Sequence, residues 1–510
     1  MSAFRKLASD TALYGLSTIL ARSVNFLLVF VQTYAFINPA DLAPNVTLYA
    51  WIGVLLTVYP LGLETAFFRF AARNKGTENA AERRRIFNRT LTLVGGVSLL
   101  ATLLTYLAAT PIAGALGLAG QEQSVRWAAL LIGIDTIMAI PFARLRVENK
   151  ARQFVTAKLI NITLNVGLNV FFISFCKSIV EGKYLPGLLP LASLVYDPAI
   201  GPAYILLANL LANLVYFWLL RRVFADFRPL FSWPQAQKLL LYSFPIMLTG
   251  LAAVLNSLTD RLLLERFLPA GFYPGHGANW ALGVYGQCLK LSVFISLAIQ
   301  SFKFAAEPFF FGQADDKNAP GLLANVTRWF IIVCVVLWVA ISLNMDLAGL
   351  MVSEKYRAGL GVVPLLMLGN LFLGIYYNIS FWFKLTDRTA FGTLITGAGL
   401  VVTFVLNYLL IPQLGYMGCA WAFLVSSFLM MALCYALGER HYPVPYNLVS
   451  AAGYVGGGGL LIYLASFVTI GNLWVAVPYH LALLGLFVGC VAAAEWPTLG
   501  PVLARRRGKK

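Results

Sequence analysis

Charged side chains are scarce in this sequence, and their scarcity excludes most soluble proteins. Asp, Glu, Lys and Arg make up 12% of the 510 residues, whereas hydrophobic residues make up 59%. A soluble globular domain carries about 25% charged residues, roughly twice the share found here. A chain this long and this apolar cannot cover its surface with polar side chains. The composition therefore predicts a membrane protein with many spans.

Residues that hold metals, form disulfides or bind nucleotides are also few. His276, His441 and His480 are far apart in the sequence, and the six cysteines form no Cys-x-x-Cys pair. The glycine run 456–459 is not followed by the Lys-Ser or Lys-Thr of a phosphate-binding loop, so we expect it to serve tight helix packing. No nucleophile–base pair is evident. We expect a protein that is not an enzyme and that has no cofactor and no metal centre.

Fourteen apolar stretches are long enough to cross a bilayer, which takes a helix of about 20 residues. They are predicted at residues 11–36, 47–70, 88–109, 126–142, 153–176, 199–220, 239–264, 281–311, 323–345, 360–385, 390–411, 415–437, 449–469 and 473–494. The predicted fold class is an all-α polytopic membrane protein of about 14 transmembrane helices.

Basic residues are concentrated in alternate loops between these stretches. The loops that alternate with these basic ones would face the outer side of the membrane. They hold only six of the 38 Lys and Arg residues: Arg126, Lys177, Lys183, Arg266, Lys355 and Arg357. Cytoplasmic loops are enriched in Lys and Arg, so this pattern predicts a multi-pass protein with both termini in the cytoplasm. The basic tail 505–510 then lies beside anionic lipid. We expect the phospholipid bilayer, and no nucleic acid, as its partner.

One cation, Arg22, lies near the middle of the first predicted span. Insertion of an arginine at the bilayer centre costs about 2.5–3.5 kcal/mol, so its guanidinium should face protein or water. Tyr14, Thr18, Arg22, Asn25 and Gln32 fall on one stripe of a helix. We expect this stripe to line a hydrated cavity.

Other charged and polar residues within the spans would share that cavity. They are Glu64, Asp135, Asn256, Asp260, Arg261, Lys290, Gln300, Lys303 and Glu307. Asp135 has two open roles, either a ligand for a proton or cation or a buried partner of an arginine. On an ideal helix, Gln287 and Lys290 point about 140° away from the later cluster of span eight. Either that helix is bent or only one of its two clusters faces the cavity.

Asparagines recur on one face of two spans. Asn161, Asn165 and Asn169 follow Lys158 in the fifth span, and Asn209 and Asn213 are spaced i, i+4 in the sixth. This pattern favours hydrogen bonds between helices over contact with a substrate.

Two pairs of short segments indicate an internal repeat. Glu64-Thr-Ala-Phe-Phe resembles Glu307-Pro-Phe-Phe-Phe, and Leu168-Asn169-Val-Phe-Phe resembles Leu406-Asn407-Tyr-Leu-Leu, at nearly the same offset. We predict an N-terminal six-helix lobe at 1–225 and a C-terminal six-helix lobe at 226–440, related by a pseudo-twofold axis along the membrane normal. Residues 441–510 would add two helices and the basic tail.

The stretches DTALYGLSTILAR, GLETAFFRF and YGQCLKLSVFISLAIQSFKFAAEPFFF resemble those of bacterial polysaccharide-biosynthesis exporters. These exporters belong to the multidrug/oligosaccharidyl-lipid/polysaccharide exporter superfamily, which also holds the lipid II flippases. The resemblance implies fourteen helices in the bacterial inner membrane. It also implies alternating access that flips an undecaprenyl-pyrophosphate-linked oligosaccharide from the cytoplasmic to the outer leaflet, with a groove for the lipid tail at the last two helices. A glycan polymerase or glycosyltransferases are the expected protein partners.

Charge within the bilayer fits that role, because phosphate oxygens accept charge-assisted bonds from Arg and Lys. The coupling ion, H⁺ or Na⁺, stays open. One alternative is an ion-coupled multidrug or organic-cation exporter on the same fold, although Arg22 counts against a cationic cargo. Another is a membrane enzyme such as a polysaccharide polymerase or ligase. Such an enzyme should have a large outer loop rich in Arg and His, and segment 177–200 is a poor candidate.

Overall fold

The structure is a computed structural model that describes residues 26–72, 80–148, 150–312, 319–386, 388, 390–468 and 470–507. Side chains at 72, 303–312, 319 and 497–507 are not among those described. By its contacts the chain divides into two compact units. Unit 1 holds residues 1–290 and 396–422, and unit 2 holds 291–395 and 423–510. The predicted lobe boundaries at 225/226 and 440/441 stay predictions.

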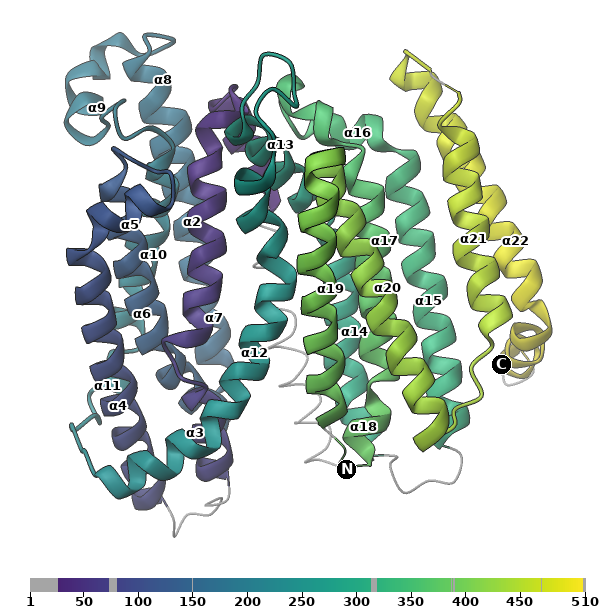
Figure 1. Ribbon diagram of the computed structural model, residues 1–510, viewed down its shortest axis with the longest axis horizontal. Coiled ribbons are helices and arrows are strands. Elements are labelled where there is room, and N and C mark those ends of the chain that lie inside the picture. Colours follow the sequence, from purple (N-terminus) through teal and green to yellow (C-terminus); the bar gives the residue numbers. More distant parts are fainter. Residues whose placement is uncertain are drawn as a thin grey trace. The chain divides into compact units, whose positions relative to one another are not determined.

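Unit 1 is built from helices, and Figure 1 shows its long helices side by side. A short apolar helix, Phe26–Ala35, comes first among the described residues. The elements that follow are α2 (Pro39–Val58), α3 (Leu63–Ala72), α4 (Ala80–Leu107), α5 (Ala109–Ala115), α6 (Glu122–Val147), α7 (Ala151–Asn169), η1 (Val170–Cys176), α8 (Lys177–Val180), η2 (Pro186–Leu188), α9 (Leu189–Val195), η3 (Gly201–Ala203), α10 (Tyr204–Leu219), α11 (Arg221–Phe224), α12 (Trp233–Phe267) and α13 (Ala278–Leu291).

Unit 2 is also helical. Its elements are α14 (Val293–Gly312), α15 (Ala319–Leu343), α16 (Met345–Leu350), η4 (Glu354–Gly359), α17 (Val362–Ile379), α18 (Phe381–Leu385), α21 (Leu448–Ala465) and α22 (Leu473–Arg507). Two further helices, α19 (Ala390–Leu414) and α20 (Tyr416–His441), have residues in both units. Helix α15 contacts α17, α21 and α22, so it lies at the centre of this unit's packing.

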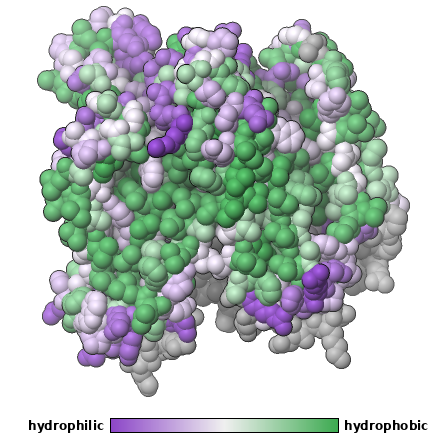
Figure 2. Space-filling view, in the orientation of Figure 1, coloured by the Kyte–Doolittle hydropathy of each residue, from purple (hydrophilic) through white to green (hydrophobic). Residues whose placement is uncertain are grey.

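The all-α polytopic fold predicted from composition is confirmed. Within the described residues, 12 helices are long and apolar enough to span a membrane, or 13 if α13 and α14 are taken as one broken span. The first predicted span, 11–36, lies mostly outside the described residues. In Figure 2 hydrophobic side chains cover the middle of the helices in each unit, and hydrophilic ones gather toward the helix ends.

Two predicted boundaries differ from the structure. Between the first two predicted spans the sequence predicts a short loop at 38–45, but α2 already begins at Pro39. Asn38 caps it by accepting a hydrogen bond from the Ala40 amide, and a proline is favoured at the first helical position. The eighth predicted span is interrupted by a turn at Ser292, between α13 and α14. Of the two alternatives that the sequence left open for this span, the break agrees with a bent helix.

Small residues set the spacing between helices in both units. In unit 1, a Cβ added at Gly133 of α6 would lie 2.4 Å from Thr102 Oγ1 of α4. Ser98 Oγ donates a hydrogen bond of 3.0 Å to the Gly133 carbonyl across the same contact. In unit 2, a Cβ at Gly458 of α21 would lie 2.9 Å from Val339 Cγ2 of α15. The tight packing expected of the 456–459 glycine run is therefore confirmed at Gly458.

Candidate functional site

The structure describes only some of the predicted cavity residues. Arg22 and Asn25 lie outside the described residues, and the side chains of Lys303 and Glu307 are also not described, although both positions lie in α14. Gln300 is half-buried in α14 of unit 2. The remaining predicted residues all belong to unit 1: Glu64, Asp135, Asn256, Asp260, Arg261 and Lys290. That all of these residues share one cavity stays a prediction.

Lys290 of α13 has a distinctive setting among these residues. Its ammonium donates hydrogen bonds to Gln32 Oε1 at 2.9 Å and to Gln287 Oε1 at 3.0 Å. Both glutamines are buried, with exposed fractions of 4% and 2%. The positive charge of Arg261 also acts on Lys290. Among the described residues, no carboxylate forms a salt bridge with Lys290. The side-chain groups that accept hydrogen bonds from its ammonium are therefore neutral amides.

The Lys290 contact also answers part of the question left open for span eight. Gln32 belongs to the polar stripe predicted for the first span. Its hydrogen bond to Lys290 shows that the cluster of Gln287 and Lys290 contacts Gln32, and the other residues of the stripe lie outside the described residues. The orientation of Lys303 and Glu307 falls outside the described side chains.

Asp260 lies on α12 and is buried, with an exposed fraction of 6%. The Tyr285 hydroxyl of α13 donates a hydrogen bond to its carboxylate. Arg261 Nε lies 3.7 Å from the same carboxylate, and the Arg261 backbone amide donates to it at 2.8 Å. One turn earlier, Asn256 accepts a hydrogen bond of 2.5 Å from Thr403 of α19. These contacts join α12 to two neighbouring helices through polar groups.

Asp135 of α6 begins a chain of polar contacts across three helices. Asn213 of α10 donates to Asp135 Oδ1 at 2.7 Å, and Asn161 of α7 donates to Asn213 Oδ1, also at 2.7 Å. The nearby cation is Lys158, whose ammonium lies 4.3 Å from the centre of the Phe142 ring. Asp135 therefore faces a lysine and an amide, and no arginine of the described residues pairs with it; its other open role, uptake of a proton or cation, stays a prediction. The interhelical bonding predicted for the asparagines is confirmed between Asn161 and Asn213.

Glu64 of α3 forms an ion pair with Arg146 of α6. The Arg146 guanidinium also lies 4.7 Å from the centre of the Phe68 ring. Nothing in the sequence indicated this partner, because Arg146 follows the fourth predicted span and was counted among the basic residues that orient the chain. Glu64 is thus neutralised within unit 1.

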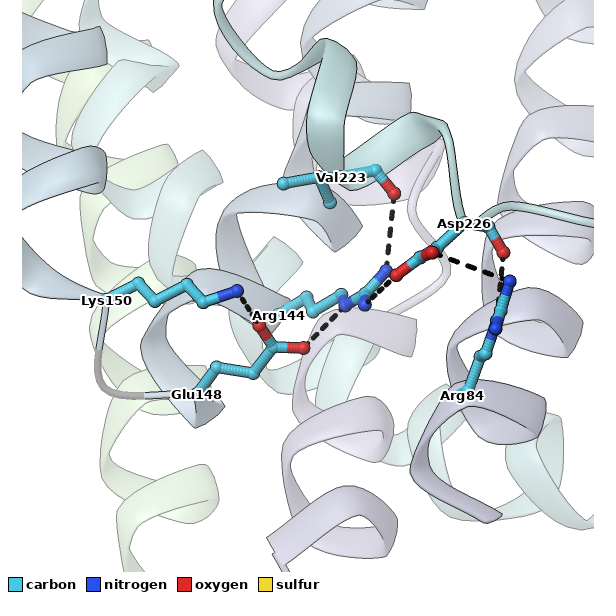
Figure 3. A network of polar contacts seen from close by, with 6 residues as sticks. All are labelled: Arg84, Arg144, Glu148, Lys150, Val223 and Asp226. Carbon is cyan, nitrogen blue, oxygen red and sulfur yellow. Dashed lines mark hydrogen bonds and ion pairs between the residues drawn. The ribbon is translucent and has the colours of Figure 1, made fainter. Parts of the chain in front are cut away.

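A second network that sequence reasoning missed lies at an end of the unit 1 helices (Figure 3). Arg144 donates to Glu148 at 2.6 Å, to Asp226 at 2.9 Å and to the Val223 carbonyl at 3.2 Å. The hydrogen bond from Arg144 lowers the pKa of Asp226. Burial alone would raise the pKa of Glu148, but hydrogen bonds from Lys150 and Arg144 outweigh burial and lower it. The network ties the end of α6 to the chain that follows α11.

Unit 2 holds a buried ion pair and two apolar cavities. Glu495 of α22 accepts hydrogen bonds from Arg328 of α15 and Tyr454 of α21, and its exposed fraction is 1%. A groove of about 380 Å³ lies between α21 and α22 and is lined by apolar residues such as Leu464 and Phe487. A second cavity of about 500 Å³ is lined by residues of α15, α17, α20 and α21. The described residues form no cluster of His, Cys, Asp and Glu that could hold a metal ion.

The described helices define an all-α polytopic membrane protein that carries charged residues within its spans. It shares its fold with solved structures of a lipid flippase and of multidrug transporters. It is similar to the lipid II flippase MurJ in an inward closed conformation, with a TM-score of 0.71 and 13% identity over 94% of this chain and 99% of that one.

Two multidrug transporters are also similar to it. An inward-facing multidrug resistance MATE family transporter of the MOP superfamily gives a TM-score of 0.60 at 14% identity over 90% of this chain and 100% of that chain. The MATE multidrug transporter DinF-BH gives a TM-score of 0.57 at 16% identity, over 86% of this chain and 95% of that chain. These three proteins are transporters or flippases. No protein-family description and no curated protein matches the sequence.

Proposed function

We propose that this protein flips an undecaprenyl-pyrophosphate-linked oligosaccharide from the cytoplasmic to the outer leaflet of the bacterial inner membrane by alternating access. The observation that carries the proposal is the setting of Lys290, a cation within a span whose hydrogen bonds go to Gln32 and Gln287. The likeness in fold to a lipid II flippase supports it. Both termini would lie in the cytoplasm, as the basic loops suggest.

The energetics of Lys290 favour an anionic cargo. A buried ammonium loses hydration that neutral amides replace only in part, so an uncompensated cation in a span is costly. Phosphate oxygens form shorter and stronger charge-assisted bonds than amide oxygens do. A pyrophosphate that reached Lys290 would restore the missing negative charge. The site would therefore attract the headgroup linkage of a lipid-linked glycan and repel an organic cation.

The groove between α21 and α22 suits the lipid tail. It is lined by residues such as Leu460, Leu464, Leu486 and Phe487, and none of its described lining residues is charged. A polyprenyl chain can occupy such a groove without desolvating polar groups. This agrees with the place for the tail that the family resemblance implies.

Coupling to an ion would use the carboxylates of unit 1. Asp135 and Asp260 lie within spans, and each accepts a hydrogen bond from a neutral side chain. Uptake of a proton or Na⁺ at Asp135 would break no salt bridge among the described residues, whereas uptake at Asp260 would compete with Arg261. A glycan polymerase or glycosyltransferases would supply or consume the cargo.

The second candidate is an ion-coupled exporter of organic cations. The observation in its favour is the likeness to two MATE multidrug transporters. A cationic cargo needs carboxylates that are free to pair with it, however. Glu64 pairs with Arg146, and Asp260 lies beside Arg261, so these two carboxylates already have cationic partners.

The two functions are separated by offering the purified protein both cargoes in proteoliposomes. Leaflet-resolved flipping of a lipid-linked oligosaccharide should proceed, and efflux of a fluorescent organic cation should not exceed that of empty vesicles. Protein-dependent cation efflux without glycan flipping would favour the second candidate and refute the first.

A further inference from the structure

The last helix is anchored to unit 2 by a buried carboxylate. Glu495 Oε1 accepts 2.8 and 2.7 Å contacts from Nε and Nη2 of Arg328, together with a hydrogen bond from the Tyr454 hydroxyl. Three helices, α15, α21 and α22, meet at this one oxygen. A buried carboxylate is tolerated because it is paired and hydrogen-bonded, so removing one partner alone should be costly.

Besides pairing with Glu495, Arg328 lines a cavity of unit 2. Its side chain is 25% exposed, compared with 1% for Glu495, and it lines the 500 Å³ cavity between α15, α17, α20 and α21. The other walls are mostly apolar and include Ile331, Phe372 and Phe428. Among the described lining residues, Arg328 alone carries a formal charge. The cavity therefore combines an apolar interior with one cation on its wall.

We propose that this cavity binds a single-chain anionic amphiphile, a prenyl or acyl phosphate, with its chain among the apolar walls and its phosphate on Arg328. The volume falls within the range of about 300–1,000 Å³ found for small-molecule sites. A guanidinium has five N–H donors, so Arg328 can bond a phosphate in addition to Glu495. The apolar walls disfavour a glycan, and the arginine disfavours a cationic or neutral amphiphile.

This site is separate from the sites used for the proposed function. The groove for the lipid tail lies between α21 and α22 and shares only Tyr454 with the described lining of the cavity, and Lys290 belongs to unit 1. Tyr454 lines both the groove and the cavity and bonds Glu495 between them. Binding at Arg328 can therefore be measured whether or not the protein flips a glycan.

Glu495 should compete with the phosphate for the guanidinium. Glu495 supplies the negative charge beside Arg328, and a bound phosphate would place a second anion there. Replacing Glu495 by glutamine removes the competing charge. The proposal therefore predicts opposite effects for the two members of one ion pair: loss of binding for Arg328→Gln and tighter binding for Glu495→Gln.

The test uses the full chain in nanodiscs of phosphatidylcholine, titrated with farnesyl phosphate, farnesol or inorganic phosphate. Farnesyl phosphate should bind saturably, and both farnesol and inorganic phosphate should bind at least tenfold more weakly. Arg328→Gln should weaken farnesyl phosphate binding at least tenfold, and Glu495→Gln should strengthen it. Arg357→Gln, at an exposed arginine of unit 2 outside the cavity lining, is the matched control and should bind as the parent does.

A lone charge left in either single variant could prevent folding. The double variant Arg328→Gln with Glu495→Gln removes both charges of this ion pair, so it should fold and fail to bind farnesyl phosphate. Equal affinity for farnesol and farnesyl phosphate, unchanged binding by the folded double variant, or weaker binding by Glu495→Gln would each overturn the proposal. Glycan flipping by the same variants is measured separately. The proposal of amphiphile binding at Arg328 can therefore fail without refuting glycan flipping, and the reverse also holds.

Discussion

Lys290 Nζ donates a hydrogen bond of 2.9 Å to Gln32 Oε1 and thereby joins α13 to the helix Phe26–Ala35. Both partners lie in unit 1. The same ammonium bonds Gln287 one turn away on its own helix. Two buried amides therefore hold one positive charge inside a membrane-spanning region, and each amide can be removed without removing the charge itself.

Replacing Gln32 by leucine should destabilise the protein. Lys290 would lose one of its two amide acceptors, and hydrogen bonds to charged groups contribute about 1.5–3 kcal/mol. The thermal unfolding midpoint of the detergent-solubilised variant should fall by several degrees. Gln123→Leu alters an exposed glutamine of α6 and serves as the control. An equal shift for both variants would show that the Lys290 contact contributes nothing.

The glycines of α21 provide a matched pair for packing. A Cβ at Gly458 would come within 2.9 Å of Val339, whereas a Cβ at Gly456 would meet nothing within 4 Å. Gly458→Ala should therefore lower the unfolding midpoint by forcing α21 away from α15. Gly456→Ala should leave it unchanged or raise it, because Ala is favoured over Gly in a helix by about 0.5–1 kcal/mol. The reverse order of stabilities would contradict this contact.

The network around Arg144 should make stability depend on acid. The pKa values of Asp226 and Glu148 are lowered from 3.8 and 4.5. Their stabilising effect is thus fully present above these unfolded-state values and is lost as pH falls through the lower folded-state values. Exposure and screening limit its size.

The acid effect is checked by unfolding midpoints measured between pH 7 and pH 3. Asp226→Asn should lower the midpoint at pH 7 and flatten its decline toward pH 3. Asp346→Asn, at an exposed aspartate of α16, should parallel the parent. If the unfolding midpoint of Asp226→Asn falls with pH as steeply as that of the parent, the ion pair does not contribute to the loss of stability in acid.

Two carboxylates within the spans of unit 1, Asp135 and Asp260, can be compared for coupling. Asp135→Asn keeps a side chain that can bond Asn213 but removes the charge beside Lys158. If Asp135 takes up the coupling ion, this variant should flip glycan at the same rate with and without a proton or Na⁺ gradient. Asp260→Asn is tested in parallel. Gradient dependence that survives in both variants would exclude both residues as the coupling site.

The positions of the helices can be predicted from the sequence because the hydropathy and length of each apolar stretch determine whether it spans the membrane. Twelve of the predicted spans have a counterpart in the described residues, with a thirteenth as the broken pair of α13 and α14. The early start of α2 was missed although Asn38 and Pro39 are a recognisable start signal. The turn at Ser292 carries no comparable signal, because neither proline nor glycine occurs there.

The partners of the charged residues could not be predicted in the same way. Arg146 and Arg144 were interpreted as orientation signals, yet they bond Glu64 and Asp226, each 82 positions away in the sequence. Glu495 ends an otherwise uncharged stretch, and its burial against Arg328 depends on how α15 and α22 meet. Such pairs are set by tertiary packing, which a single sequence does not encode in its local pattern.

The central claim is that Lys290 handles the phosphate linkage of the cargo. It is tested most directly by leaflet-resolved flipping of a lipid-linked oligosaccharide in proteoliposomes that contain equal amounts of the parent, Lys290→Gln or Lys183→Gln. Lys183 has a side chain that is 62% exposed and is the control. We expect Lys290→Gln to lose at least nine-tenths of the flipping rate and Lys183→Gln to retain it. Undiminished flipping by correctly inserted Lys290→Gln protein would contradict the account.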